Sequence, residues 1–363
     1  MLELFPDSSP TQQFVGIARL ATQGQALSDG HNVEYLSVEN RSILTRCLSP
    51  RMPFTWMINP YRGCEFACKY CYARYTHQFM ELHDGLDFER KIYVKQHSAW
   101  LLRQELKNVA ADESIAIGTA TDPYQPAERR FEITRSLMEE FARHSGLKIS
   151  MVSKSDLMLR DLELLRAIAS RNQFTVCITV TTMNTDLARI LEPRAPRPDL
   201  RMKAVRNLVN AGVRAGVNCA PVLPGITDAP KDLDALVHAA AEAGAAFVFT
   251  NTLFLKPCAE KIFMPFLEEK FPKLVALYHQ RYSRNAYLPE PYQRRIGNIV
   301  RRYCEKYGIR SRRMDPVQPS AGASMRAEQI PLFASAQKLE AGSERQAVEK
   351  LTRAKTQQIR KAG

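Results

Sequence analysis

Apolar, β-branched runs recur between residues 55 and 254, and longer amphipathic stretches separate them. The runs have the length of strands, and the stretches repeat their apolar residues with the period of a helix. Strands are predicted at 55–59, 114–120, 148–153, 174–182, 216–223 and 246–254. Helices are predicted at 98–110, 134–144, 155–170, 200–212 and 229–244.

Alternation of strands and helices predicts an α/β fold built from right-handed βαβ units around a parallel sheet. The last three strands are almost wholly apolar, as expected when helices or a core cover both faces. Six units are too few for a closed eight-stranded barrel, and no GxGxxG follows the first strand. We therefore expect a partial, open, six-stranded parallel β/α barrel with its chemistry at the carboxyl ends of the strands. A doubly wound sheet is the structural alternative.

The pattern also divides the chain into four parts. Residues 1–52 lack a sustained period and are predicted to be a loosely structured lead-in to a core at 53–258. Residues 259–309 read as a helical extension. Residues 310–363 are rich in small and polar residues, so a disordered tail is expected, with a helix near its end.

Composition and charge indicate where the protein is expected to be located and what kind of partner it is expected to bind. No apolar run approaches the roughly 20 residues of a membrane-spanning helix, and the N-terminus lacks the pattern of a secretory signal. A cytoplasmic protein without a membrane partner is expected. The formal net charge is +13, to which the tail contributes 11 Lys and Arg against 5 Asp and Glu. This balance favours a polyanionic partner such as nucleic acid.

Three of the eight cysteines lie close together, directly after the first predicted strand. Cys64, Cys68 and Cys71 form a C-x3-C-x2-C pattern, with Tyr70 before the last of them. This spacing lets three thiolates converge on an iron–sulfur cluster and leaves one iron open for chemistry. A zinc site with His77 as fourth ligand is the alternative, in which case the chain would be a non-catalytic binding module.

These residues resemble the radical S-adenosylmethionine (SAM) superfamily, whose hallmark is CxxxCxΦC in the loop after the first barrel strand, where Φ is aromatic. The strings NPYRGCEFACKYCYARYTH, GTATDPYQPAE and SKSDLMLRDLELL further resemble the subgroup related to spore photoproduct lyase. The resemblance implies a [4Fe–4S] cluster on the three cysteines, with SAM chelating the open iron. It also implies reductive cleavage of SAM to a 5′-deoxyadenosyl radical that abstracts hydrogen from a substrate, and an electron donor such as flavodoxin or ferredoxin.

The resemblance also nominates residues that contact the SAM cofactor. Tyr70 is expected beside the adenine, and Thr121 and Asp122 at the methionine amino group. Asp122 with Pro123 equally suits a plain turn. Lys154 is expected to pair with the methionine carboxylate. Two weaker candidates for the ribose and adenine edges are Thr181 and Asn218.

One position departs from the lyase pattern. The resembled lyase has a hydrogen-donating cysteine near the end of the second strand, where this chain has Thr119. A hydroxyl is a far poorer hydrogen-atom donor than a thiol, so the chain is not expected to be a spore photoproduct lyase. Cys219 and Cys258 are substitute donors, although each also suits a packed core position.

A short apolar motif interrupts the polar tail. Gln329, Leu332 and Phe333 lie in the string QIPLF, which resembles the peptide by which bacterial repair and replication proteins dock on the DNA sliding clamp. With the positive charge and the lyase-like motifs, it favours a nucleic-acid substrate, and DNA repair in particular. Radical modification of a protein or small molecule is the alternative.

Overall fold

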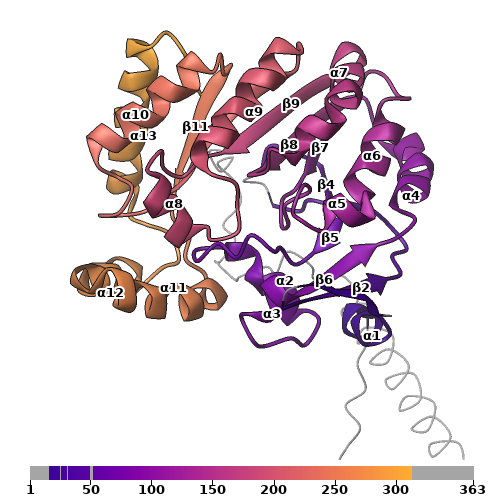
Figure 1. The fold of residues 1–363 in the computed structure, drawn as a ribbon, viewed down its shortest axis with the longest axis horizontal. Coiled ribbons are helices and arrows are strands. Elements are labelled where there is room, and N and C mark those ends of the chain that lie inside the picture. The colour runs from indigo at the N-terminus through magenta and orange to yellow at the C-terminus, as the bar shows by residue number, and fades with distance from the viewer. Residues whose placement is uncertain (1–15, 25, 31, 50–51, 313–363) are drawn as a thin grey trace, which may run out of the picture. The chain divides into compact units, whose positions relative to one another are not determined.

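The six predicted parallel strands lie side by side in sequence order within one larger sheet (Figure 1). The computed structural model describes residues 16–24, 26–30, 32–49 and 52–312. The parallel strands are β4 (Trp56–Ile58), β7 (Ser114–Ile117), β8 (Lys148–Ser153), β9 (Gln173–Thr179), β10 (Arg214–Val222) and β11 (Phe247–Thr252). Because each strand lies beside its predecessor, the sheet has no switch point, and the doubly wound alternative is wrong.

Two further strands form the edges of this sheet. β3 (Leu44–Arg46) pairs antiparallel with β4, and β12 (Arg310–Arg312) pairs parallel with β11. Within the described residues the two edge strands do not pair with each other. The prediction of a partial, open α/β barrel is therefore confirmed.

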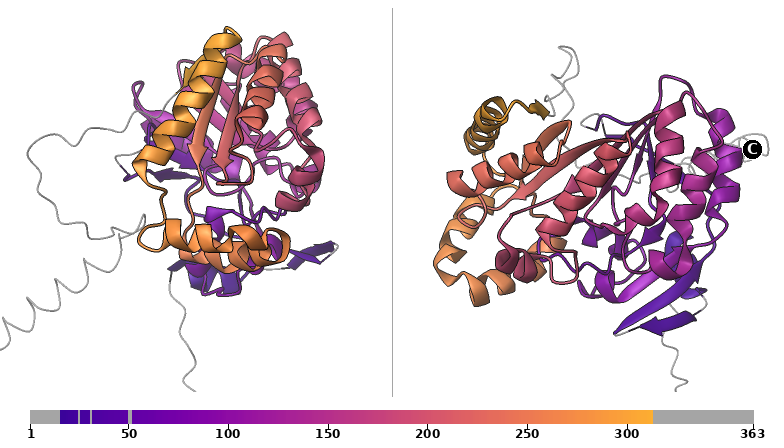
Figure 2. Two further views of the ribbon diagram at one scale, coloured as in Figure 1. Left: turned by 90° about the vertical axis from the view of Figure 1, so that its left-hand side faces the viewer. Right: turned by 45° about the horizontal axis from the view of Figure 1, so that its top comes forward.

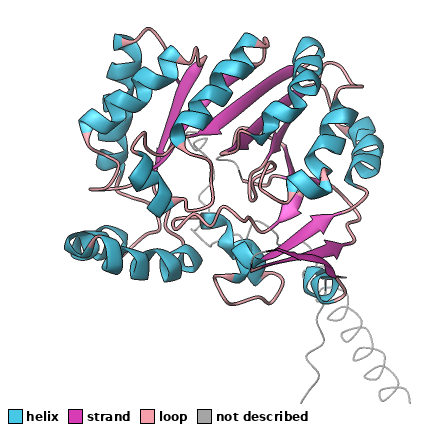
Figure 3. Cartoon of the chain, viewed as in Figure 1, coloured by secondary structure: helices cyan, strands magenta, loops and turns pink. Residues whose placement is uncertain are grey.

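Helices that follow the strands cover the outer face of the sheet (Figures 1 and 3). They are α4 (Ser98–Glu105), α6 (Ile133–Phe141), α7 (Leu162–Arg171), α9 (Pro198–Asn210), α10 (Pro230–Glu242) and α13 (Glu290–Lys306). Proline stands in the first turn of α9, α10 and α13, where its missing N–H costs no hydrogen bond. Figure 2 shows α13 packed along the strands at the C-terminal side of the sheet.

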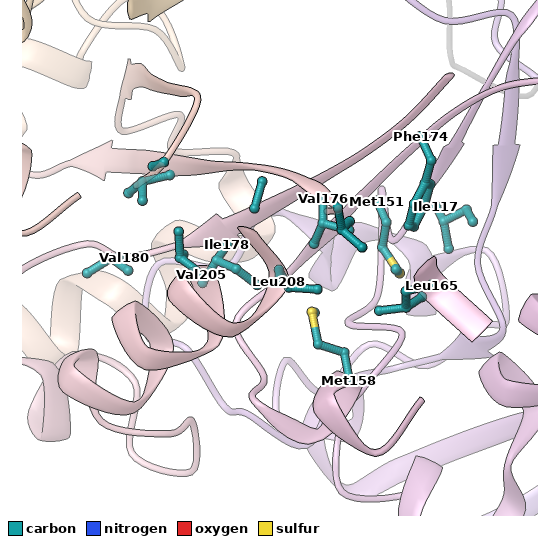
Figure 4. Close-up of a cluster of buried hydrophobic side chains, with 14 of the residues drawn as sticks. Ile117, Met151, Met158, Leu165, Phe174, Val176, Ile178, Val180, Val205 and Leu208 are labelled. Carbon is teal, nitrogen blue, oxygen red and sulfur yellow. The ribbon is translucent and has the colours of Figure 1, made fainter. Parts of the chain in front are cut away.

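The main core lies between the sheet and these helices. Figure 4 shows one part of it, in which Met151 and Val176 of neighbouring strands meet Leu165 and Leu208 from the covering helices. All four side chains are fully buried. Alternate residues of β8 are buried, which matches the two-residue period of a strand. This packing fixes the register of the strands and hence the height at which each carboxyl end reaches the site.

A second sheet of four strands has no counterpart in the sequence prediction. Its order is β1 (Ala26–Gly30), β2 (Val33–Val38), β6 (Lys91–Lys95) and β5 (Tyr61–Arg62). A short helix, α1 (Gly16–Thr22), precedes it. The described part of residues 1–52, predicted to be a loosely structured lead-in, thus contains one helix and three strands. β5 leads directly into the cysteine segment, so this sheet anchors the start of the candidate site.

The remaining helices are short or belong to the C-terminal extension. They are α2 (Tyr75–Gln78), α3 (Asp87–Arg90), α5 (Glu128–Phe131), α8 (Thr185–Leu191), α11 (Pro257–Lys270) and α12 (Val275–Tyr282). Residues 259–309 are mostly helical, as predicted. The expected start of the tail at residue 310 is wrong, because 310–312 form β12. The rest of the tail, with the string QIPLF, lies outside the described residues.

The chain divides into a main unit, Met1–Arg46 with Phe54–Asp315, and a smaller unit that includes Cys47–Pro53. The site described below belongs to the main unit. No helix of the described residues has the length and apolar character needed to cross a bilayer.

Candidate active site

The loop that carries the three cysteines, residues 63–71 (the cysteine loop), begins where its backbone approaches that of residues 88–91 closely. Gly63 has a φ of +85°, and a β-carbon at this position would lie 2.8 Å from the carbonyl oxygens of both Phe88 and Lys91. The amide of Cys64 donates to the carbonyl of Phe88 at 2.8 Å. Glycine is therefore required here for its conformation and for its lack of a side chain.

The three thiols follow within one turn-rich segment. Cys68 is buried, and Cys64 and Cys71 are partly buried. The amide of Lys69 donates to the carbonyl of Leu191 at 3.0 Å, and that of Cys71 donates to the carbonyl of Cys68 at 3.2 Å. The first of these bonds holds the segment against the end of α8, and the second closes a turn within the segment.

The three thiols share one buried electrostatic environment. Burial raises the pKa of the Cys64 thiol well above its ordinary value, and the charges of Asp122, Cys68 and Cys71 raise it further. Burial likewise raises the pKa of Cys68 to about 12, against the opposing charge of Lys154. Three thiolates so placed need a bound cation to replace their protons. The donor set and the glycine cradle fit an iron–sulfur cluster.

The segment after β7 holds the cysteine loop in place. The hydroxyl of Thr121 donates to the carbonyl of Gly63 at 2.6 Å. The side-chain Nε2 of Gln125 donates to the same carbonyl at 3.1 Å. Its Oε1 accepts from the backbone amide of Glu65 at 3.0 Å. Gln125 is fully buried. The predicted cofactor residue Thr121 thus contacts the loop that carries the cysteines.

Two buried carboxylates tie the same segments to the small sheet. Glu65 accepts from the amide of Ala127 at 2.7 Å and from the hydroxyl of Tyr35 at 2.9 Å. Glu128 accepts from the hydroxyl of Tyr61 at 2.5 Å. The lyase-like string at 118–128 therefore acts largely as a scaffold for the cysteine loop.

Asp122 joins the ends of β7 and β8. Its Oδ1 accepts from the amide of Tyr124 at 2.9 Å and from the hydroxyl of Ser153 at 2.7 Å. Its Oδ2 accepts from the amide of Lys154 at 2.7 Å. Burial raises the pKa of Asp122, and these hydrogen bonds oppose the rise. The turn seen at Asp122 leaves Oδ2 with capacity for one further donor.

Lys154 lies over the ring of Tyr70, with its Nζ 5.7 Å from the ring centroid. Burial alone would lower the pKa of Lys154, but the negative charges of Cys68 and Glu192 outweigh it and raise the pKa. The ammonium therefore stays charged beside the cysteine loop. It is a suitable partner for a carboxylate of a bound ligand.

The hydroxyl of Tyr70 points away from solvent into a buried polar network. It bonds Thr181 at 3.0 Å and also donates to Glu192. Thr181 donates to the same carboxylate at 2.8 Å. Arg201 forms an ion pair with Glu192 at 2.5 Å, and each of these two side chains is 1% exposed. The structure thus places Tyr70, Thr181 and Lys154, which the resemblance assigns to the cofactor, close to one another. The ion pair behind them was not predicted from the sequence.

A signal for one member of that pair exists in the sequence. Arg201 lies in α9 on the same helical face as the buried Ala204, Val205 and Leu208. A charged residue within an apolar stripe must find a buried partner. Nothing comparable marks Glu192, which follows the end of α8.

Asn218 lies on β10 opposite Thr179, the last residue of β9. Its Nδ2 donates to the hydroxyl of Thr179 at 3.3 Å. Its Oδ1 is buried and has no hydrogen-bond partner among the described residues. A buried acceptor of this kind suits a donor from a bound ligand.

The two candidate thiols differ in position. Cys219 is fully buried among the core residues of the main sheet, and burial raises its pKa to about 12. Cys258 lies in the first turn of α11, and its Sγ is 3.8 Å from the carbonyl oxygen of Tyr72, the residue after Cys71. Thr119, at the position of the lyase's donor, accepts from the side chain of Asn59 at 3.0 Å.

Comparison with known proteins identifies the class. The sequence profile described as the Radical SAM superfamily matches residues 58–237. Together with the open β/α barrel and the cysteine loop, this match shows that the chain belongs to the radical SAM superfamily. It is an enzyme of the radical SAM class, and the superfamily's cofactors are SAM and an iron–sulfur cluster.

Relatives extend the match over most of the chain. An uncharacterized protein of Mycobacterium tuberculosis is 34% identical over 283 residues, which cover 78% of this chain and 83% of the relative. An uncharacterized protein of Methanocaldococcus jannaschii is 27% identical over 243 residues, or 65% of this chain and 83% of the relative.

Solved structures of spore photoproduct lyase share the fold. One mutant of that enzyme superposes with a TM-score of 0.59 at 16% identity, covering 77% of this chain and 82% of the other. A second, with bound SAM and a dinucleoside spore photoproduct, gives 0.58 at 15% identity with the same coverage. The expected likeness to this subgroup is confirmed for the fold.

The reading of the chain as a non-catalytic zinc module is overturned by this family membership. His77, the proposed fourth zinc ligand, is buried with its Nε2 3.0 Å from the carbonyl oxygen of Lys91. Its ring packs edge-on against Phe88 and Tyr93. Within the described part of the chain, no three His, Cys, Asp or Glu side chains converge on a position for one metal ion.

Proposed function

We propose that Cys64, Cys68 and Cys71 ligate a [4Fe–4S] cluster and that the enzyme acts on nucleic acid, specifically on lesion-bearing DNA. The observation that carries the first part is the position of the three thiols. They lie on one loop after the first strand of an open β/α barrel, where a glycine cradle and buried side chains fix the backbone. When bound, the cluster and SAM supply a 5′-deoxyadenosyl radical.

The chain's own residues bind and orient the cofactor. Lys154 holds a charged ammonium for the methionine carboxylate, and Oδ2 of Asp122 has a free acceptor position for the methionine ammonium. Oδ1 of Asn218 offers an acceptor to the nucleoside part. Tyr70 keeps its ring at the cysteine loop because Thr181 and Glu192 bind its hydroxyl. Burial of these groups excludes water from the reactive radical.

Support for a nucleic-acid substrate comes from charge and from analogy. The net charge of +13 suits a polyanion. The structurally similar lyase has been solved with a dinucleoside spore photoproduct. Thr119 cannot supply a thiol hydrogen, so we propose a reaction outcome that differs from that of spore photoproduct lyase. If a thiol takes part, Cys258 is better placed than Cys219, since its sulfur lies beside the cysteine loop.

Two partners belong to the same proposal. Enzymes of this class need a reductant, and flavodoxin or ferredoxin is proposed for that role. Gln329, Leu332 and Phe333 are proposed to dock the enzyme on the sliding clamp, with the apolar pair filling a pocket and the glutamine making a polar anchor.

The test begins with anaerobic reconstitution using iron and sulfide, followed by SAM and dithionite. Wild type is expected to hold about four iron atoms per chain and to release 5′-deoxyadenosine. Cys71→Ala is expected to lose both, whereas Cys47→Ala, which removes a cysteine outside the loop, is expected to keep both. Zinc in place of iron, or an intact cluster that yields no 5′-deoxyadenosine, would contradict the proposal.

The substrate is tested separately with ultraviolet-irradiated duplex DNA. Mass spectrometry of the digested DNA should show a lesion change that requires SAM. A protein that cleaves SAM but leaves irradiated DNA unchanged and does not bind it would redirect the search to a protein or small-molecule substrate.

A further inference from the structure

Aromatic rings gather at the edge of the candidate site, where the chain exposes them to solvent. Phe254 follows β11, and Tyr287 lies between α12 and α13. Their rings are stacked, with centroids 4.3 Å apart and planes 21° from parallel. Tyr287 is 43% exposed. A stacked pair in which one ring is largely exposed to solvent differs from the buried aromatic residues of the core.

The backbone holds this pair firmly. Phe254 and Tyr287 form an antiparallel β-bridge. The amide of Leu255 donates to the carbonyl of Ala286 at 2.9 Å, and the amide of Tyr287 donates to the side chain of Asn285 at 3.0 Å. The rings are therefore preorganised, which lowers the entropic cost of binding a flat ligand.

The pair adjoins the reactive centre. Tyr72, one residue after Cys71, is 41% exposed, and its ring centroid lies 6.3 Å from that of Phe254. Its hydroxyl donates to the carbonyl of Thr119 at 2.5 Å. Its carbonyl contacts the thiol of Cys258. The rings thus lie between the cysteine loop, the end of β7 and the start of α11.

A cation completes the surface. Nζ of Lys256 lies 3.8 Å from the ring centroid of Tyr75 and 5.7 Å from that of Phe254. Lysine beside stacked aromatic rings is the combination by which proteins bind single-stranded nucleic acid, since the rings stack on bases and the cation meets the phosphate. Isolated exposed aromatic residues are ordinary, but a fixed and contiguous group beside a cation is not.

We propose that Phe254, Tyr287 and Lys256 form a stacking platform for an unpaired base of the substrate strand. The inference rests on the proposed nucleic-acid substrate and adds how it is held: a base next to the reacting nucleotide stacks on Tyr287, and Lys256 contacts the adjoining phosphate. The duplex must therefore be opened locally at the site, as in enzymes that extrude a nucleotide to reach it.

The experiment uses reconstituted enzyme and a fluorescein-labelled single strand of twelve thymidines. Tyr287→Ala is expected to weaken binding about 5- to 100-fold, the range of one lost base–aromatic stack. Tyr287→Trp should restore it. Trp100→Ala removes a 61% exposed aromatic side chain on α4 and should leave binding unchanged. Lys256→Gln should reduce the slope of log affinity against log salt by about one.

The outcomes separate this inference from the function it rests on. If wild type binds the strand and Tyr287→Ala binds it equally well, the platform is wrong and the nucleic-acid substrate stands. If wild type binds neither this strand nor irradiated DNA at low salt, the proposed substrate is wrong. A loss of 5′-deoxyadenosine formation by Tyr287→Ala without DNA would assign the rings to the adenine of SAM, which overturns the platform.

Discussion

Buried charges form the inner wall of the candidate site, and their energetics follow from their surroundings. Arg201 also donates to the carbonyls of Pro196 at 2.7 Å and of Thr179 at 3.1 Å. Its guanidinium therefore joins α9 to the end of β9 while neutralising Glu192. Because Tyr70 and Thr181 bind the same carboxylate, this pair fixes side chains that the family resemblance assigns to the cofactor.

Removing Arg201 should destabilise the protein strongly. Arg201→Gln leaves Glu192 buried and unpaired, at a cost of about 3–5 kcal/mol in the free energy of unfolding. The matched control is Arg197→Gln, four residues earlier, where the ion pair with Asp199 at 2.7 Å has both partners 53% exposed. Its loss should cost less than about 1 kcal/mol. Urea unfolding of both variants measures the difference, and equal losses would contradict the assigned role of the buried pair.

Among single residues, the sequence predicted those whose chemistry is local. The three cysteines are recognisable because their spacing alone brings the thiols together. The resemblance assigns Thr121 to the methionine amino group of SAM, whereas in the structure its hydroxyl donates to the carbonyl of Gly63, 58 positions away. Such a contact depends on which segments the fold places side by side, and the pattern of one segment does not contain it.

The cysteine loop as an element depends on one glycine, and this dependence can be measured. Gly63→Ala should lower iron content after reconstitution by more than half, because the new methyl group would meet the carbonyl oxygens of Phe88 and Lys91 at 2.8 Å and displace the loop. Gly212→Ala is the control. Gly212 has a φ of +81°, but no heavy atom of the described part of the chain lies within 4 Å of the added carbon.

Both substitutions incur the cost of an alanine at positive φ, about 1–2 kcal/mol. Only Gly63→Ala should also lose iron, which colorimetric iron analysis after desalting detects. Full iron content in Gly63→Ala would show that the loop tolerates a shift of its first residue.

Most of the parallel strands were predictable because their apolar runs show a pattern of their own, although β4 has only three residues. The sequence placed the third strand at 148–153, the same range as β8. The small sheet escaped prediction because β5 has only two residues and β2 and β6 are stable only as a pair packed on other elements. The alternating burial of Val33 and Tyr35 becomes visible as a pattern only once their partner strand is known.

The molecule as a whole consists of a catalytic barrel and a basic C-terminal segment, and the segment is characterised by its sequence only. Family membership and fold account for the barrel, whereas the proposed docking on the sliding clamp rests on the charge and the apolar motif of the tail sequence. A clamp-binding peptide would raise the local concentration of the enzyme at DNA without altering its active site.

This separation gives a prediction for the tail. Leu332→Ala combined with Phe333→Ala should weaken binding of the full-length enzyme to a purified bacterial sliding clamp at least 30-fold, because buried apolar anchors of a short peptide carry about 2 kcal/mol or more of its binding energy. Formation of 5′-deoxyadenosine should be unchanged. Leu339→Ala alters another leucine of the tail outside the motif and should bind like wild type. Isothermal titration calorimetry measures the clamp affinity of wild type and of both variants. Equal affinity of the double variant and wild type would exclude the motif as the contact, and failure of wild type to bind would exclude the clamp as a partner while leaving the catalytic assignment intact.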